Sequence, residues 1–148
     1  MPYENENTYY HAVEKGEEED FHRRYEVAFA DLRRRTGESA PEYPNVIEGE
    51  ERYSESDYED TSPSDNSLIV GRFQRASEEE AREAVRAALD SFQDWSEIGY
   101  PQRVSVMEIA ASIMREEKFE MAAAVTLDNG KNRYEAVADI DEAIDFLM

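Results

Sequence analysis

Apolar side chains recur every three or four residues along most of the chain, which is the pattern of amphipathic helices. The first such stretch begins at Glu17, has four acidic residues in its first turn and ends with three arginines, in agreement with the helix dipole. Gly37 follows, and we expect it to end the helix. The apolar stripe consists of Phe21, Tyr25, Ala28, Phe29 and Leu32. Residues 1–16 are polar and aperiodic, and they predict a flexible N-terminal arm.

The second half of the chain has clear helix signals. Ser77 and Glu80 form a capping box, in which each side chain bonds the backbone N–H of the other residue, and apolar residues then keep helical spacing to Trp95. Pro101 suits the first position of a following helix. A third helix is closed by Asn129-Gly130. The fourth runs to Met148 with no trailing glycine or polar tail, so we expect it to be cut short there.

Residues 39–67 are rich in Ser, Pro, Asp, Glu and Tyr, and they predict turns and short strands. Asn45-Val46-Ile47 followed by Glu48-Gly49 indicates a strand that enters a tight turn and returns through Glu51-Arg52-Tyr53. We expect residues 54–66 to be a loop, and residues 67–73 to be another strand. The fold expected for this chain is therefore mainly α-helical, with a few short antiparallel β-strands.

The charge balance limits the possible partners. The chain has 148 residues, with 36 acidic and 16 basic residues and a net charge of −20; only three of the basic residues are lysines. A surface with this much negative charge repels nucleic acid and anionic lipid. We therefore expect neither nucleic acid nor a membrane as a partner. An acidic interaction surface is one interpretation. We favour a surface adapted to a salty, halophilic cytoplasm, because the acids are spread along the whole chain.

The sequence offers no self-sufficient catalytic or metal site. Cysteine is absent, so no thiolate ligand or cysteine nucleophile is present. His11 and His22 lie apart and outside any zinc motif. Asp57, Glu59, Asp60 and Asp65 could suggest a calcium-binding loop. The glycine and the final glutamate of such a loop are not at their places in this segment, so we expect a solvated loop. No phosphate-binding glycine motif occurs. No run of apolar residues and no basic N-terminus indicates a membrane span or a secretory signal, so a cytoplasmic location is expected. We assign no catalytic, cofactor-binding or metal-ligating residue.

Several segments, taken in order, resemble the N-terminal region of the aldehyde dehydrogenase superfamily. They are Val46-Ile47-Glu48-Gly49-Glu50, Thr61-Ser62-Pro63, Leu68-Ile69-Val70-Gly71, the helix from Ala81 to Trp95, Pro101-Gln102-Arg103-Val104 and Thr126-Leu127-Asp128-Asn129-Gly130-Lys131. Two further segments, Phe21-His22-Arg23-Arg24-Tyr25 and Asp141-Glu142-Ala143-Ile144-Asp145-Phe146-Leu147, are similar to the 1-pyrroline-5-carboxylate (L-glutamate γ-semialdehyde) dehydrogenases. The resemblance divides the chain into the arm (1–16), a helical extension (17–44) and an incomplete nucleotide-binding and oligomerisation region (45–148).

The resemblance implies an α/β parent fold and an NAD- or NADP-dependent oxidation of a small aldehyde in a homo-oligomeric enzyme. In such enzymes a cysteine thiolate attacks the aldehyde, hydride passes to the nicotinamide, and an activated water releases the acid. The catalytic and nucleotide-binding groups of the family lie downstream of the matched region. The fragment alone is therefore expected to bind no cofactor and to be inactive, with its helix Ala81–Trp95 and its last helix packing on strands that are not in this chain. The alternative is an independent acidic helical module without catalysis that binds a protein partner or cations.

The acidic composition makes a direct prediction about salt. Self-repulsion among surface carboxylates is screened as the Debye length falls to about 3 Å at 1 M salt. The melting temperature of the chain should therefore rise steeply as KCl is added, which circular dichroism measures. A melting temperature that is indifferent to salt would contradict the halophilic interpretation.

Overall fold

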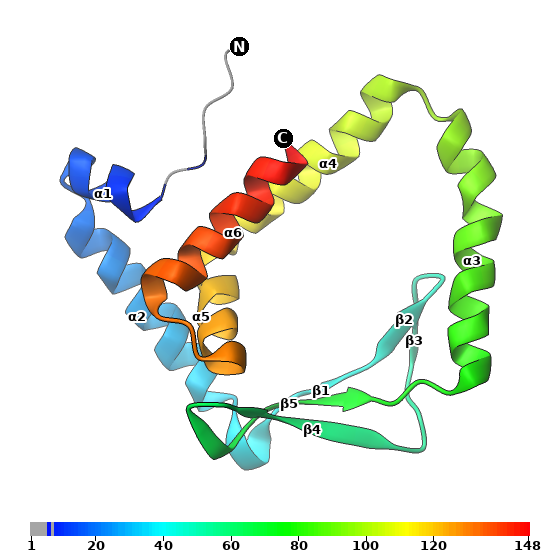
Figure 1. The fold of residues 1–148 in the computed structure, drawn as a ribbon, viewed down its shortest axis with the longest axis horizontal. Helices are drawn as coiled ribbons and strands as arrows, with labels where there is room; N and C mark the ends of the chain where they lie inside the picture. Colours follow the sequence, from blue (N-terminus) through cyan, green and yellow to red (C-terminus); the bar gives the residue numbers. More distant parts are fainter. Residues whose placement is uncertain (1–5, 7) are drawn as a thin grey trace.

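The structure is a computed structural model that describes residue 6 and residues 8–148. In chain order its elements are α1 (Tyr9–Lys15), α2 (Glu18–Arg34), a 3-10 turn η1 (Gly37–Ser39), β1 (Glu42–Tyr43), β2 (Asn45–Ile47), β3 (Glu50–Arg52), β4 (Asp57–Ser62), β5 (Asp65–Gln74), α3 (Glu78–Glu97), α4 (Tyr100–Glu116), α5 (Lys118–Asn129) and α6 (Arg133–Leu147). Helices α2, α4, α5 and α6 gather on one side, and the strands and α3 extend away from them (Figure 1). None of the helices in the described residues is long and apolar enough to span a bilayer.

The expected N-terminal arm contains a short helix. The Thr8 N–H donates to His11 Nδ1 at 3.1 Å and caps the start of α1. Gly16 ends α1 with a left-handed φ of 72°, which turns the chain directly into α2. Sequence periodicity missed α1 because seven residues hold too few apolar positions to show a stripe. Residues 1–5 and 7 of the expected arm lie outside the described residues.

Helix α2 confirms the predicted amphipathic helix but ends before the predicted stop. Its last residue is Arg34, and the Thr36 hydroxyl donates to the Arg33 carbonyl at 2.7 Å, which satisfies one of the free carbonyls at the helix end. Gly37 has a φ of 76° and begins η1 instead of capping α2. The prediction that Gly37 ends the helix was wrong because a threonine side chain already serves the carbonyls of the last turn.

The strands form two small sheets. The predicted hairpin is confirmed, with β2 and β3 antiparallel and joined by Glu48 and Gly49, both at positive φ. The second sheet has the order β1-β5-β4, in which β4 is antiparallel to β5 and β1 is parallel to it. The prediction of a loop over 54–66 was wrong, because β4 occupies Asp57–Ser62 and β5 begins at Asp65. Most of the polar side chains of β4 are exposed, so this edge strand shows no alternation of apolar and polar residues.

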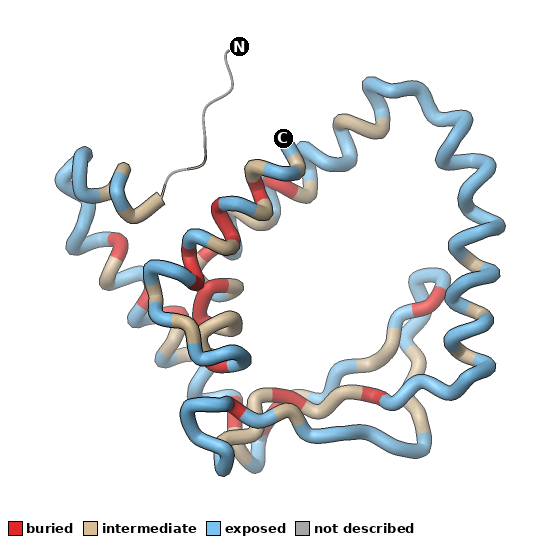
Figure 2. Tube along the Cα trace, in the orientation of Figure 1, coloured by how far each residue is buried: buried red, intermediate tan, exposed pale blue. Residues whose placement is uncertain are grey.

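The core lies between α2, α4, α5 and α6 (Figure 2). Its buried residues are Phe21, Tyr25, Ala111, Ala122, Ala136, Val137, Ile140 and Ile144. The Tyr25 hydroxyl donates to Thr126 Oγ1 at 2.7 Å, which satisfies a polar atom that α2 brings against α5. Helix α6 therefore packs within the chain, and the expectation that it needs partners from outside is corrected. The apolar face of α6 is covered by helices that precede it.

The apolar face of helix α3 is exposed, in contrast to that of α6. Its predicted capping box is present: the Ser77 hydroxyl accepts from Glu80 N–H at 3.2 Å, and the Glu80 carboxylate accepts from Ser77 N–H at 2.7 Å. No residue of α3 is buried, and Val85, Leu89 and Phe92 are each more than 60% exposed. The accessible surface of the chain is 10357 Å², against about 7,800 Å² expected for a compact protein of this mass. The apolar face of α3 contributes to this excess.

The core packing makes a stability prediction within one helix. Ile144→Ala removes a side chain that is fully buried in α6, and it should lower the free energy of unfolding by about 2–5 kcal/mol. Urea unfolding at high salt measures the change. The matched control is Phe146→Ala in the same helix, where the phenylalanine is 83% exposed and the expected change is within about 0.5 kcal/mol. Equal effects of the two substitutions would contradict this placement of α6.

Candidate functional site

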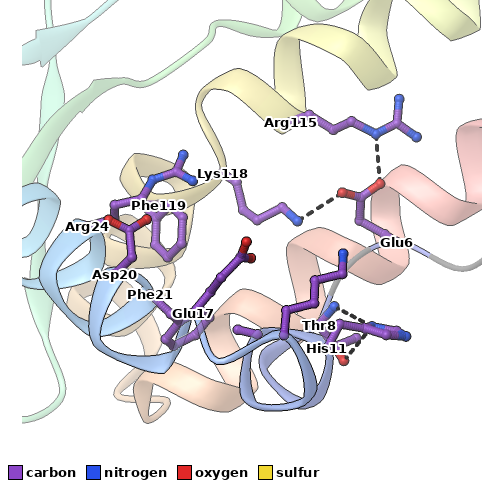
Figure 3. Close-up of a pocket in the computed structure, with 12 residues that line it drawn as sticks. Glu6, Thr8, His11, Glu17, Asp20, Phe21, Arg24, Arg115, Lys118 and Phe119 are labelled. Atoms are coloured by element: carbon purple, nitrogen blue, oxygen red, sulfur yellow. Dashed lines mark hydrogen bonds and ion pairs between the residues drawn. The ribbon is translucent and has the colours of Figure 1, made fainter.

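The largest concentration of paired charges in the described structure surrounds a pocket of about 250 Å³ beside α1. Its walls come from the N-terminal segment, α1, α2, the end of α4 and the start of α5 (Figure 3). The lining residues are Glu6, Thr8, His11, Ala12, Lys15, Glu17, Asp20, Phe21, Arg24, Arg115, Lys118 and Phe119. Apolar and charged side chains thus share one small space, where a charge is costly unless it is paired.

Glu6 forms the centre of the pairing. Arg115 Nε donates to its Oε2 at 2.7 Å, and Lys118 Nζ donates to its Oε1 at 3.0 Å. Figure 3 shows the Glu6 carboxylate between these two cations. Its backbone N–H donates to Asp145 Oδ1 at 2.8 Å, so Glu6 contacts α4, α5 and α6 at once. The Glu6 side chain is 10% exposed, which makes these ion pairs much less screened than surface pairs.

Asp141 of α6 also contacts Lys118. The Lys118 ammonium is 2.5 Å from Asp141 Oδ1, and both side chains are buried. Apart from this ion pair, neither carboxylate oxygen of Asp141 has a hydrogen-bond partner in the described part of the chain. Lys118 therefore serves two carboxylates, one from the N-terminal segment and one from α6.

The two carboxylates respond oppositely to this environment. Burial raises the pKa of Asp141 to about 6, although Lys118 acts against the shift. Burial also acts to raise the pKa of Glu6, but hydrogen bonds and charge from Arg115 and Lys118 outweigh it, and the pKa of Glu6 is lowered below 4.5. Near pH 5 the cluster thus holds an ionised Glu6 and a protonated Asp141. Opposed shifts of this kind separate the roles of two neighbouring acids.

The pocket does not hold the cysteine nucleophile that the family resemblance implies. The chain has no cysteine, and the Thr8 hydroxyl and His11 Nδ1 lie 3.3 Å apart but serve the cap of α1. In the described residues no three His, Asp or Glu side chains are placed to hold a metal ion. The four acids considered for calcium lie along β4 and at the start of β5, and Asp60 hydrogen-bonds Asp128, which raises the pKa of Asp128. The contacts of the cluster fasten Glu6 to α4, α5 and α6.

Sequence reasoning missed this cluster, although one signal was present. Asp141 occupies a core position of the α6 stripe, between Ile140 and Ile144 and four residues after Val137. A carboxylate at such a position needs a buried cation, and lysine is rare in this chain. The identity of that cation was not readable, because α5 and α6 bring Lys118 and Asp141 together only through tertiary packing.

The opposed pKa shifts predict the pH dependence of stability. A buried acid whose pKa is raised from 3.8 to about 6 stabilises the fold fully below 3.8 and loses that contribution as the pH rises through 6. Asp141→Asn mimics the protonated acid and does not titrate. Between pH 4 and 7 the unfolding free energy of the wild type should therefore fall by about 2 kcal/mol relative to this variant, as measured by urea unfolding.

The matched control is Asp139→Asn on the same helix. Asp139 pairs with Lys131 at a half-exposed position, so its substitution should change stability by less than about 1 kcal/mol. A constant difference between wild type and Asp141→Asn from pH 4 to 7 would contradict the buried, protonated state of Asp141.

Comparison with known proteins extends these observations. The aldehyde dehydrogenase family matches residues 50–148. The chain is 38% identical over 106 residues to 1-pyrroline-5-carboxylate dehydrogenase 2 of Bacillus subtilis, an alignment that covers 72% of this chain and 21% of the relative. It is 34% identical over 122 residues to 1-pyrroline-5-carboxylate dehydrogenase of Geobacillus kaustophilus, covering 82% and 24%. The chain thus spans less than a quarter of the length of these relatives.

Solved structures of related proteins superpose on nearly the whole chain. The NAD-bound 1-pyrroline-5-carboxylate dehydrogenase from Thermus superposes with a TM-score of 0.87 at 31% identity, covering 99% of this chain and 27% of that one. Proline utilization A from Bdellovibrio bacteriovorus superposes with a TM-score of 0.86 at 30% identity, covering 99% and 15%. The superposition therefore also includes most of the residues before residue 50, which the family match leaves out. On the family match and these relatives, the chain belongs to the aldehyde dehydrogenase family.

Proposed function

We propose that this chain is the N-terminal part of an NAD- or NADP-dependent aldehyde dehydrogenase that oxidises L-glutamate γ-semialdehyde to glutamate in proline catabolism. The observation that carries the proposal is the superposition of 99% of the chain on a 1-pyrroline-5-carboxylate dehydrogenase. The relatives in Bacillus and Geobacillus bear the same enzyme name, and their identities of 34–38% support the same assignment. A cytoplasmic homo-oligomer is part of the proposal.

The role proposed for these residues is structural. The family reaction needs a cysteine nucleophile, and this chain has none. We therefore assign the thiol chemistry and the nicotinamide cofactor to the part of the enzyme that lies beyond the matched quarter. On its own the chain is expected to bind no nucleotide and to oxidise no aldehyde.

The exposed face of α3 supports this role. The chain exposes roughly 2,500 Å² more than a compact protein of its mass, an excess comparable to the area that obligate interfaces bury. Val85, Leu89 and Phe92 follow one another at helical spacing on α3, and all are exposed. In the complete enzyme we propose that residues beyond this chain cover that face.

A chimera tests the proposed function. This chain replaces the matching N-terminal part of the Bacillus subtilis relative, and reduction of NAD⁺ is measured with L-glutamate γ-semialdehyde as substrate. The chimera should be active, whereas the chain alone should give no signal. An inactive but folded chimera would contradict the proposal. A monomeric chain with one sharp, reversible unfolding transition would instead favour the independent interaction module.

Two variants of α3 test whether its apolar face is covered in the complete enzyme. Leu89→Glu places a charge where the isolated chain is already solvated, so the isolated chain should keep its stability. In the chimera the same change buries a carboxylate, and activity should fall about tenfold or more. Ser91→Glu adds the same charge on another face of α3 and should leave activity within about twofold. Equal activity of the two variants would show that the apolar face of α3 is not covered.

A further inference from the structure

Helix α3 ends without the groups that usually stabilise the C-terminus of a helix. Its last turn holds no basic side chain, and Asp94 and Glu97 place negative charge at the negative end of the helix dipole. No left-handed glycine caps it, because the capping residue Ile98 is extended, with a φ of −62° and a ψ of 131°. A cationic donor from outside α3 would therefore stabilise this end.

Arg103 of α4 supplies such a donor. Its Nη1 donates to the carbonyl oxygen of Ile98 at 2.6 Å, and the carbonyl oxygen of Ser96 lies 3.5 Å from the same nitrogen. Figure 1 shows the chain turning sharply between the two helices. This turn, residues 96–103, is the elbow between α3 and α4. The guanidinium group of Arg103 thus bonds one arm of the elbow to the other.

The position of Arg103 is unfavourable for α4 itself. It is the fourth residue of α4, and a cation near the N-terminus of a helix opposes the helix dipole. The first turn of α4 holds no acidic residue that would offset this charge. Arg103 therefore stabilises the end of the preceding helix at the expense of the helix that carries it.

Few other contacts fix the direction of α3. At its N-terminal end α3 contacts β2, and the Ser54 hydroxyl lies 3.5 Å from a carboxylate oxygen of Glu80. None of the residues of α3 is buried. The buried residue of α4 is Ala111, so the turns of α4 next to the elbow project beyond the core. The C-terminal half of α3 thus depends on the elbow for its position.

We propose that Arg103 is a positioning residue, which fixes the elbow and so holds the exposed apolar face of α3 where the rest of the enzyme packs against it. Without the guanidinium group, the last turn of α3 frays and the helix moves about Gly99. Covering α3 must then also order it, which weakens the packing. This role in the complete enzyme rests on the proposed function, whereas the elbow is a property of the chain alone.

The distance between two spin labels on either side of the elbow tests the proposal. The chain has no cysteine, so labels attach only at Asp90→Cys in α3 and Glu108→Cys in α4, which are both exposed. Pulsed electron resonance at high salt should give a distance distribution that is about twofold or more broader in Arg103→Ala than in the wild type. Equal widths would overturn the proposal. Protection of the Ile144 amide from hydrogen exchange checks that the core stays folded.

Two further variants assign the effect to the hydrogen bonds of Arg103. Arg103→Lys keeps a cationic donor, so its distribution should be narrower than that of Arg103→Ala; equal broadening by both would overturn the proposal. The matched control is Arg86→Ala, which removes the same charge from α3, where Arg86 pairs with Glu79 of its own helix. Its distribution should be that of the wild type, and broadening like that of Arg103→Ala would show that loss of charge alone moves α3, against the proposal.

The chimera with the Bacillus subtilis relative separates this proposal from the proposed function. Arg103→Ala should lower the recovered activity of the chimera about threefold or more at an unchanged KM, because fewer molecules complete the packing of α3. Equal activity of the two chimeras would overturn the role of Arg103 in the enzyme. An inactive but folded chimera with Arg103 in place would contradict the proposed function, while the label distances still decide whether Arg103 fixes the elbow.

Discussion

Close packing of small side chains where α2, α4, α5 and α6 meet is the constraint on which the rest of the structure depends. Ala111, Ala122, Ala123 and Ala136 are fully buried, so the helix backbones can approach closely. That approach seats the larger Ile144 and fixes the start of α5 against the middle of α6. The buried ion pairs of Lys118 with Glu6 and Asp141 depend on this packing.

The close packing of the helices divides the ion pairs of this acidic chain into exposed pairs and buried pairs. Most ion pairs lie on exposed helix faces, such as Arg34 with Asp31 and Arg82 with Glu78, where each contributes little and salt screens it. Lys118 is different, because it is buried between two carboxylates that would be costly to bury alone. Surface ion pairs therefore weaken as salt is added, whereas the cluster around Lys118 joins Glu6 to α5 and α6.

The elements that local chemistry determines were predictable from the sequence. The capping box of Ser77, the proline at the start of α4 and the glycine after α5 act through neighbours in the chain, and all lie where expected. Strand β4 was not predictable, because its polar residues gain their order only by pairing with β5. The ion cluster was hidden for the same reason: Glu6 and Arg115 meet only through tertiary structure. The absence of catalytic residues remains a prediction, which the assay of the chain alone tests.

Helix α3 lies apart from α2, α5 and α6 (Figure 1). The central claim is our proposal that residues beyond this chain cover the exposed apolar face of α3 in the complete enzyme. Hydrogen exchange along the backbone tests it most directly, measured on the chain alone and on the chimera with the Bacillus subtilis relative. Amides of Glu78–Glu97 should become about tenfold or more better protected in the chimera, while those of α5 and α6 are protected in both. Equal, fast exchange of the α3 amides in both proteins would contradict the claim.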